Sequence, residues 1–202
     1  MKIVKVETLI DSGDFARSVE RERLHDDVLQ AIGKIVWPPG SDKFTIRPQK
    51  KGNGVPSIRK QLTANLVREE LKNSWEKELK IKLATSRSSP GALDAVVKTG
   101  YGNVAVEWET GNISSSHRAM NKMALHLMRG KLISGTLILP TRELYKYLTD
   151  RVGNWEELEP YADLWKALPI RNGILEVVVV SFDELSDDVP LIPKGTDGRA
   201  LR

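Results

Sequence analysis

The sequence predicts an α/β fold in which a mixed central β-sheet is flanked by helices. Apolar residues recur at helical spacing in some segments and alternate or run continuously in others, and the two kinds of segment are interleaved along the chain. The resulting order is helices, a hairpin, a helix, a strand, a helix and a strand, which is typical of a mixed sheet covered by helices. The 202 residues suffice for one domain with a full-sized core, so we expect a single domain over residues 1–202.

The first part of the chain predicts two long helices separated by short irregular elements. Residues 14–35 carry apolar side chains at helical spacing, and the run Trp37-Pro38-Pro39-Gly40 ends that helix. Residues 44–46 predict a short strand, and residues 49–54 a basic loop. Residues 56–78 predict the second long helix, with Pro56 in its first turn.

The middle of the chain predicts a β-hairpin. Residues 92–98 form a β-like run that contains Asp94, residues 99–103 supply turn residues, and residues 104–109 form the second strand. The hairpin would place Asp94 beside the second strand. The rest of the chain predicts a helix over 115–129, a strand over 133–139, a helix that opens at Pro140-Thr141, a helical stretch over 155–165 broken near Pro160, a strand over 174–182 covered on both faces, and a loop-like tail over 190–202.

Composition excludes several classes of protein. No apolar run approaches the roughly 20 residues that a bilayer span needs, and the N-terminus lacks the apolar stretch of a signal peptide. The absence of cysteine excludes disulfides and thiolate metal sites and fits a reducing cytoplasm, where we expect the protein to act. The formal charge is only +4, but residues 43–87 hold twelve Lys or Arg against four Glu, about +8. This basic zone can meet a phosphate backbone, although it can also be the solvated face of a helix.

Three carboxylates in the hairpin suggest metal chemistry. Glu107 and Glu109 are two apart on a strand and therefore point to one face, where Asp94 can join them. Clustered carboxylates suit Mg²⁺, which prefers carboxylate oxygens and bound phosphate. The Asn, Ser and Arg side chains of residues 112–118 are of the types that read base edges, so the combination predicts a sequence-specific nuclease. Exposed strands often carry glutamates without any catalytic role, and that alternative stays open from these residues alone.

Other polar residues near this motif have simpler interpretations. His117 can be a metal ligand, but with carboxylates at hand it is better interpreted as packing or bonding to backbone. Arg118 and the pair Asp150-Arg151 can be solvated charges at helix ends. The apolar residues at helical spacing between Met120 and Met128 are interpreted as core or interface.

Runs of residues shared in order over about 36–198 resemble the BamHI family of type II restriction endonucleases. The runs are Trp37-Pro38, Phe44-Thr45-Ile46, Asn53-Gly54-Val55-Pro56, Glu109-Thr110-Gly111-Asn112-Ile113-Ser114-Ser115-Ser116-His117-Arg118, Asn121-Lys122, Tyr147-Leu148-Thr149-Asp150-Arg151-Val152, Glu156-Glu157-Leu158-Glu159-Pro160-Tyr161 and Val189-Pro190-Leu191-Ile192-Pro193-Lys194-Gly195. The resemblance implies a sheet core of the PD-(D/E)xK nuclease type and a homodimer acting on a palindrome. It also implies the site GGATCC, cut after the first G to leave 5′-GATC ends.

The family pattern implies roles for particular residues. Two Mg²⁺ ions per active site would be held by Asp94, Glu107 and the backbone carbonyl of Trp108, with Glu109 as a further ligand or the general base. The third position of the motif is Glu in this family rather than Lys, and the sequence has Glu109 there. A fourth acid lies on the helix before the hairpin, where Glu76 and Glu78 both fit the position.

The resemblance also implies which residues contact DNA. They are Asn112, Ser114 and Arg118 at the start of a helix, Asp150 and Arg151 as a second set, Asn53, Val55 and Arg59 upstream, and the minor-groove loop Gly195–Gly198 with Asp197. Arg pairs readily with guanine O6 and N7, and Asp with the cytosine amino group, so these types fit a site ending in G·C.

The same resemblance implies partners. A DNA methyltransferase would act on the same site, and the two protomers would meet through the apolar face around Met120–Leu127 and the segment Trp155–Trp165. Two other functions remain as alternatives: a non-catalytic, sequence-specific DNA-binding protein on the same fold, and a nuclease with loose sequence preference.

Overall fold

The structure, a computed structural model, describes residues 1–66, 75–79, 91–109, 111–149 and 152–195. Within these residues a six-stranded sheet has the strand order β1-β7-β6-β5-β4-β3. Its strands are β1 (Lys2–Ser12), β3 (Glu76–Leu79), β4 (Leu93–Lys98), β5 (Asn103–Trp108), β6 (Ser134–Pro140) and β7 (Gly173–Ser181). The pairs β5–β6 and β6–β7 are parallel, and the others are antiparallel.

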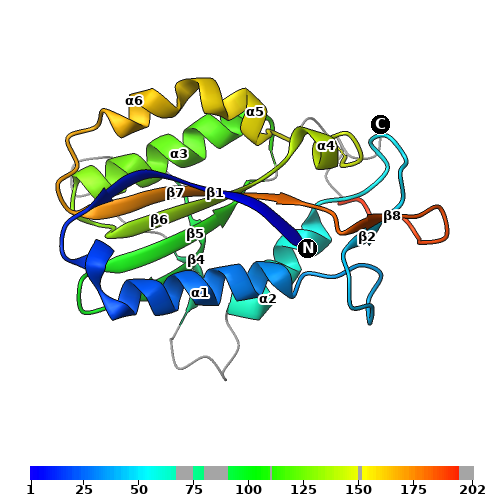
Figure 1. Cartoon of the computed structure of the whole chain (residues 1–202), viewed down its shortest axis with the longest axis horizontal. Helices are drawn as coiled ribbons and strands as arrows, with labels where there is room; N and C mark the ends of the chain where they lie inside the picture. Colours follow the sequence, from blue (N-terminus) through cyan, green and yellow to red (C-terminus); the bar gives the residue numbers. More distant parts are fainter. Residues whose placement is uncertain (67–74, 80–90, 110, 150–151, 196–202) are drawn as a thin grey trace.

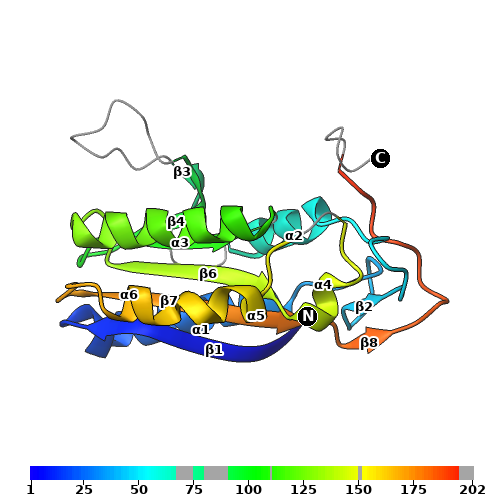
Figure 2. The same cartoon turned by 90° about the horizontal axis from the view of Figure 1, so that it is seen from above.

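Helices cover both faces of this sheet (Figure 1). One face carries α1 (Val19–Gly33) and α2 (Pro56–Leu66), and the other carries α3 (Ile113–Met128), α5 (Trp155–Leu158) and α6 (Ala162–Lys166). At one end of the sheet, β2 (Thr45–Ile46) pairs in parallel with β8 (Glu184–Leu185) beside the short helix α4 (Arg142–Tyr145) (Figure 2). Short 3₁₀ turns occupy Phe15–Arg17 and Glu159–Tyr161. The predicted mixed sheet flanked by helices is therefore confirmed, and no helix in the described part of the chain could span a membrane.

Strand β7 shows why a continuous apolar run belongs in the middle of such a sheet. Val178 and Val180 join the core under α1 and α2, while Val177 and Val179 join the core under α3 and α6. Successive side chains of a strand point to opposite faces, so a strand covered on both sides must be apolar at every position. The predicted burial of 174–182 on both faces is confirmed.

Two of the long helices, α1 and α3, begin at side-chain caps. Ser18 accepts a hydrogen bond from the backbone amide of Arg21 at the start of α1, and Asn112 accepts one from Ser115 at the start of α3. Such caps satisfy amides that have no partner within the helix. The helices predicted over 14–35 and 115–129 are confirmed.

The helix predicted over 56–78 is wrong in its last part. Helix α2 ends at Leu66 among the described residues, and Glu76–Leu79 is the strand β3. Glu76 pairs with Val96 of β4, and Lys77 with Ala95. Pairing with a neighbouring strand overrides a local helical pattern, because the backbone hydrogen bonds of the edge are satisfied there. Both candidates for the fourth acid therefore lie on a strand and not on a helix.

Strand β1 was not expected from the sequence. It pairs antiparallel with β7 at the edge of the sheet, and its alternation is broken by charged residues such as Lys2, Lys5 and Glu7. Val4 and Val6 of this strand are exposed. An edge strand with charges has a weak sequence signal, since charges are also how proteins protect such edges from further pairing.

The hairpin predicted in the middle of the chain is confirmed. Strands β4 and β5 pair in the register Ala95 with Val106, and Thr99 closes the turn by hydrogen bonds with Gly102. Gly102 has φ +141°, which favours glycine. One residue beyond the pair Ala95–Val106, the same register places Asp94 opposite Glu107, as the hairpin prediction required.

The predicted interface face of α3 needs a correction. Met120, Met123, Ala124 and Leu127 are buried against the sheet within the same chain, and Trp155 and Trp165 are buried as well. Side chains that fill the protomer's own core cannot also form a subunit contact. The exposed apolar residues of this region are instead Leu125, Met128, Tyr161 and Leu164.

Candidate active site

Asp94 is the second residue of β4, and its carboxylate contacts both β5 and α2. Its Oδ2 accepts a hydrogen bond of 2.9 Å from the backbone amide of Trp108. Its Oδ1 lies 3.6 Å from Nη1 of Arg59 on α2. The aspartate therefore joins α2 to the end of the hairpin, and Arg59, predicted as a DNA contact, reaches the carboxylate region.

Glu107 faces α3 and is paired with a lysine. Nζ of Lys122 lies 2.7 Å from each carboxylate oxygen and donates a further hydrogen bond of 2.9 Å to the carbonyl of Ala92. Burial raises the pKa of Glu107 to about 7; Lys122 opposes this shift, and the charges of Asp94 and Glu109 add to it. A carboxyl group with a raised pKa and charged neighbours in a cavity is characteristic of functional sites.

Glu109 follows the end of β5, where the chain turns into α3. Its Oε1 accepts a hydrogen bond of 2.6 Å from the backbone amide of Gly111. A Cβ at Gly111 would meet Oγ of Ser115 at 2.6 Å and this carboxylate at 2.9 Å, so only glycine fits the tight approach. The turn thereby fixes Glu109 at the first residue after the strand.

The three carboxylates are neighbours, but each is held by a group of the protein. Among the residues that the structure describes, no three His, Cys, Asp or Glu side chains lie close enough together to hold a metal ion as they stand. Asp94 and Glu109 are nevertheless near enough to influence the charge of Glu107. An all-oxygen set with two buried or half-buried acids fits Mg²⁺ by donor chemistry, while the side chains of Glu76 and Glu78 lie outside the described part.

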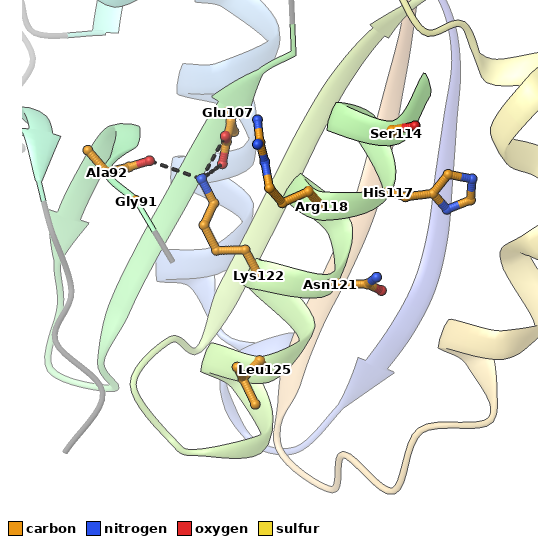
Figure 3. Close-up of a pocket in the computed structure, with 9 residues that line it drawn as sticks. All are labelled: Gly91, Ala92, Glu107, Ser114, His117, Arg118, Asn121, Lys122 and Leu125. Carbon is orange, nitrogen blue, oxygen red and sulfur yellow. Dashed lines mark hydrogen bonds and ion pairs between the residues drawn. The ribbon is translucent and has the colours of Figure 1, made fainter. Parts of the chain in front are cut away.

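An open cavity of about 860 Å³ lies in front of Glu107 (Figure 3). One wall is the approach to β4 at Gly91 and Ala92, and the opposite wall is α3. Positions four apart on a helix share a face. The residues of α3 that line the cavity include Ser114, Arg118 and Lys122, together with His117, Asn121 and Leu125.

The predicted base readers at the start of α3 are exposed. Asn112, Ser114 and Arg118 are accessible, and Nη2 of Arg118 lies 3.4 Å from Oγ of Ser115. They stand at the N-terminal end of the helix, beyond the carboxylates. A duplex that reached these side chains would also lie near the cavity.

The upstream residue Asn53 lies in the interior. It is fully buried, donates hydrogen bonds to the carbonyls of Arg47 and Tyr147, and accepts one from the amide of Ile192. Because its side-chain amide and oxygen already have hydrogen-bond partners, Asn53 connects three segments of the chain and is not positioned to contact a base. Val55 is also buried, so a direct side-chain contact of either residue with DNA is not what this arrangement favours.

The bracing by Asn53 brings distant predicted contacts together. The backbone amide of Thr149 donates to the carbonyl of Asn53, and the backbone amide of Gly54 donates to the carbonyl of Ile192. The amide of Gly153 bonds to the carbonyl of Gly111 near α3. Segments on both sides of Asp150-Arg151, and the approach to Gly195, thus converge on the end of the molecule that carries the readers; Asp150, Arg151 and Asp197 themselves lie outside the described residues.

The ring of His117 packs against aromatic side chains, as expected from the sequence. Its ring meets Tyr161 edge-on with centroids 4.5 Å apart, and Trp165 at 5.8 Å. The aromatic contact connects α3 with the end of the chain segment that leads into α6, so His117 contributes to packing between these helices.

Lys122 was not singled out as a site residue. It is 7% exposed and sits beside Glu107, although the sequence shows only one lysine on an amphipathic helix. The available signal was its spacing, four residues after Arg118 and eight after Ser114 on one helix face.

The family model and the two relatives that are similar in sequence agree on one family. A family model described as restriction endonuclease BamHI matches residues 1–199. The type II restriction enzyme OkrAI of Oceanobacter kriegii is 42% identical over 202 residues, covering all of both chains. The type II restriction enzyme BamHI of Bacillus amyloliquefaciens is 36% identical over 188 residues, which cover 90% of this chain and 84% of that protein. The fold is similar to restriction endonuclease BglII in a crystal structure with a DNA 16-mer, with a TM-score of 0.59 at 11% identity, covering 91% of this chain and 83% of that one.

Proposed function

The chain belongs to the BamHI family of type II restriction endonucleases, and we propose that it cuts double-stranded DNA at the palindrome GGATCC after the first G. The named relatives are site-specific deoxyribonucleases, so the substrate is DNA and the reaction is phosphodiester hydrolysis. The observation that carries the proposal is that Asp94 lies opposite Glu107, and that Glu107 lines a cavity whose other wall is the predicted reading helix. We expect this activity in the cytoplasm, with a DNA methyltransferase protecting the host's own sites.

The carboxylates have separate roles in this proposal. Asp94 and Glu107, with the carbonyl of Trp108, would hold two Mg²⁺ ions, which when bound supply an activated water and stabilise the leaving 3′-oxygen. Glu109 is fixed at the end of β5 by Gly111 and would accept the proton of the attacking water. The products would be 5′-phosphate and 3′-hydroxyl ends.

The basic partner of Asp94 can move to the DNA when the substrate binds. Arg59 approaches Asp94 at 3.6 Å and is half exposed, so it can leave the aspartate for a phosphate. A purely DNA-binding protein on this fold would gain nothing from carboxylates facing phosphate, because they repel it. The arrangement therefore favours cleavage over binding alone.

Specificity would come from the exposed start of α3 and from the neighbouring loop. Asn112, Ser114 and Arg118 would read the major groove together with Asp150 and Arg151, and the segment at Gly195 with Asp197 would approach the minor groove. Asn53 and Val55 would act through the shape of their loop, because both are buried. Arg and Asp side chains suit the G·C pairs at the ends of the proposed site.

We also propose that the active enzyme is a homodimer. A palindromic site calls for two readers related by a two-fold axis. Leu125 and Met128 of α3 are exposed beside Leu164, which is 66% exposed, and these three line a groove of about 260 Å³ between α3 and α6. Replacing Leu164 with Glu should yield monomers in light scattering, whereas the matched exposed change Val19→Glu should not; a wild type that stays monomeric with and without DNA would end the proposal.

One plasmid digest tests the function. A plasmid with a single GGATCC should be linearised with Mg²⁺ and left intact without it, and sequencing of the ends should show 5′-GATC overhangs. A plasmid in which one base pair of the site is changed is the matched control. Binding without cutting would favour the non-catalytic alternative, and cutting at scattered positions would favour a nuclease of loose preference.

A further inference from the structure

Lys122 is a buried lysine whose ammonium group is hydrogen-bonded and paired within the protein. It is 7% exposed; its Nζ donates hydrogen bonds to the Ala92 carbonyl and to Oε1 of Glu107, and lies 2.7 Å from Oε2 of the same carboxylate as an ion pair. Burying a charge is costly unless it is paired and hydrogen-bonded, and this pairing meets that requirement. A lysine held in this way cannot serve as a phosphate contact on the surface.

The ion pair of Lys122 is of interest because its partner is Glu107. Glu107 forms part of the wall of the cavity, and in the proposed function it is one of the acids that bind Mg²⁺. A carboxylate has about four lone-pair sites on its two oxygens. Nζ of Lys122 donates to Oε1, while Oε2 is buried and accepts no hydrogen bond from the described residues, so Glu107 keeps acceptor capacity for a cation while the lysine remains in place.

Lys122 belongs to α3, the helix that also carries the proposed base-reading residues. Ser114, Arg118 and Lys122 follow at intervals of four residues on α3, and the side chains of Arg118 and Lys122 both extend toward the side of the helix where Glu107 lies (Figure 3). The bond from Lys122 to Ala92 also ties this helix to the approach of β4. The position of α3 and the position of Glu107 are therefore mechanically connected through one side chain.

We propose that Lys122 is a positioning residue that orients Glu107 for cation binding and links the DNA-reading helix α3 to the metal site. The inference rests on the proposed function of Glu107 as a metal ligand. Ligating carboxylates are commonly held by a hydrogen-bonding partner outside the ligand set, and loss of such a partner typically weakens metal affinity or activity by about 10- to 100-fold.

Mn²⁺ binding to the DNA-free protein tests this directly, with free Mn²⁺ counted by electron paramagnetic resonance. Lys122→Met should weaken Mn²⁺ binding by about 10- to 100-fold, and Lys131→Met, which removes the same charge from an exposed position after α3, should leave it unchanged. The Lys122→Met change should have no further effect in a Glu107→Gln background, because the lysine acts through that carboxylate.

The folded state and the alternatives are covered by further measurements. Thermal unfolding checks each variant, and Lys122→Gln, which retains a donor for the Ala92 carbonyl, replaces Lys122→Met if the latter does not fold. Unchanged or tighter Mn²⁺ binding in the Lys122 variant would overturn the proposal, the tighter result showing that the ammonium competes with the cation. An equal loss in the Glu107→Gln background would overturn it too, whereas wild-type binding by Glu107→Gln alone would instead refute the metal site of the proposed function.

Discussion

Glu107 and Glu176 are two carboxylates on one sheet with the same kind of surroundings and different uses. Glu107 on β5 is paired with Lys122 of α3, and Glu176 on β7 accepts a hydrogen bond of 2.8 Å from Thr136 and lies 3.1 Å from Nδ1 of His25 on α1. Both are mostly buried and both meet a basic side chain from the helix packed above them.

The difference lies in the space and charge around them. Glu107 borders an open cavity of about 860 Å³ and has further acids beside it, whereas the space at Glu176 is about 10 Å³, too little for any ligand larger than a water molecule. Arg21 approaches Glu176 from the same helix as His25, so this acid is surrounded by bases. A buried, paired carboxylate is therefore not a site by itself; open space and neighbouring like charge are what make Glu107 the candidate.

The largest expected effect follows from removing the charge of the site acids. Glu109→Gln keeps the shape but removes a base, so cleavage should fall by at least about 10²- to 10⁴-fold. Cognate DNA affinity in the same salt should be retained or increased, because repulsion of the phosphate is relieved. Measuring cutting and affinity together decides the matter: cutting at nearly the wild-type rate, or lost only in proportion to binding, would remove Glu109 from the mechanism.

The matched change on the other side of the sheet should affect stability instead. Glu176→Gln leaves Arg21 without a counter-charge and disturbs the hydrogen bonds that Glu176 makes with Thr136 and His25, so the free energy of unfolding should fall by about 1–3 kcal/mol. Urea unfolding measures this loss. Cleavage per folded molecule should stay at the wild-type value; a large catalytic loss in a folded Glu176→Gln enzyme would contradict the contrast between the two acids.

A change in a reader should have an effect of similar or smaller size, confined to one base pair. Arg151→Ala should cost about 1–3 kcal/mol in discrimination at its base pair, because it leaves a polar base edge unpaired. Lys50→Ala is the matched control on an exposed basic loop, and it should weaken all sequences alike and lower the salt slope by about one charge. Equal losses for cognate and random DNA with Arg151→Ala would argue against the assignment.

Much of the fold was accessible from the sequence because local pattern and final packing agree there. The hairpin, α3 and β7 each bury the face that their periodicity indicates. Strand β3 and strand β1 were missed for opposite reasons: the first looks helical until it pairs with β4, and the second is too charged to look like a strand. Both depend on partners far along the chain, which a local pattern does not contain.

In the candidate site, the sequence could predict the proximity of Asp94 to Glu107 but not the basic partners of these acids. The spacing of Glu107 and Glu109 and the hairpin placing of Asp94 follow from strand geometry. The pairing of Arg59 with Asp94 and of Lys122 with Glu107 joins residues from separate elements, as does the burial of Asn53 among three segments. A basic side chain on an amphipathic helix is ordinarily solvated, so only the packing of α2 and α3 against the hairpin reveals these partners.

The effect that depends most on conditions is a dependence of stability on pH that Glu107 should show. Its pKa is raised to about 7, chiefly by burial, above the ordinary value of 4.5. A folded-state pKa above the unfolded one means that the folded protein binds more protons between these values. The contribution of Glu107 to stability is therefore full below about pH 4.5 and is lost as the pH rises through about 7.

Comparing wild type with Glu107→Gln isolates this contribution. In metal-free urea unfolding, wild type should lose stability relative to Glu107→Gln mainly between about pH 4.5 and about pH 7, by at most about 1.4 kcal/mol per pH unit. Excess Mn²⁺ should reverse the trend, because the cation binds the ionised carboxylate and stabilises the folded state more as the pH rises. A pH-independent difference between the two proteins without metal would show that Glu107 is already ionised throughout, held so by Lys122, and the contrast with Glu176 would then rest on the cavity and the neighbouring acids alone.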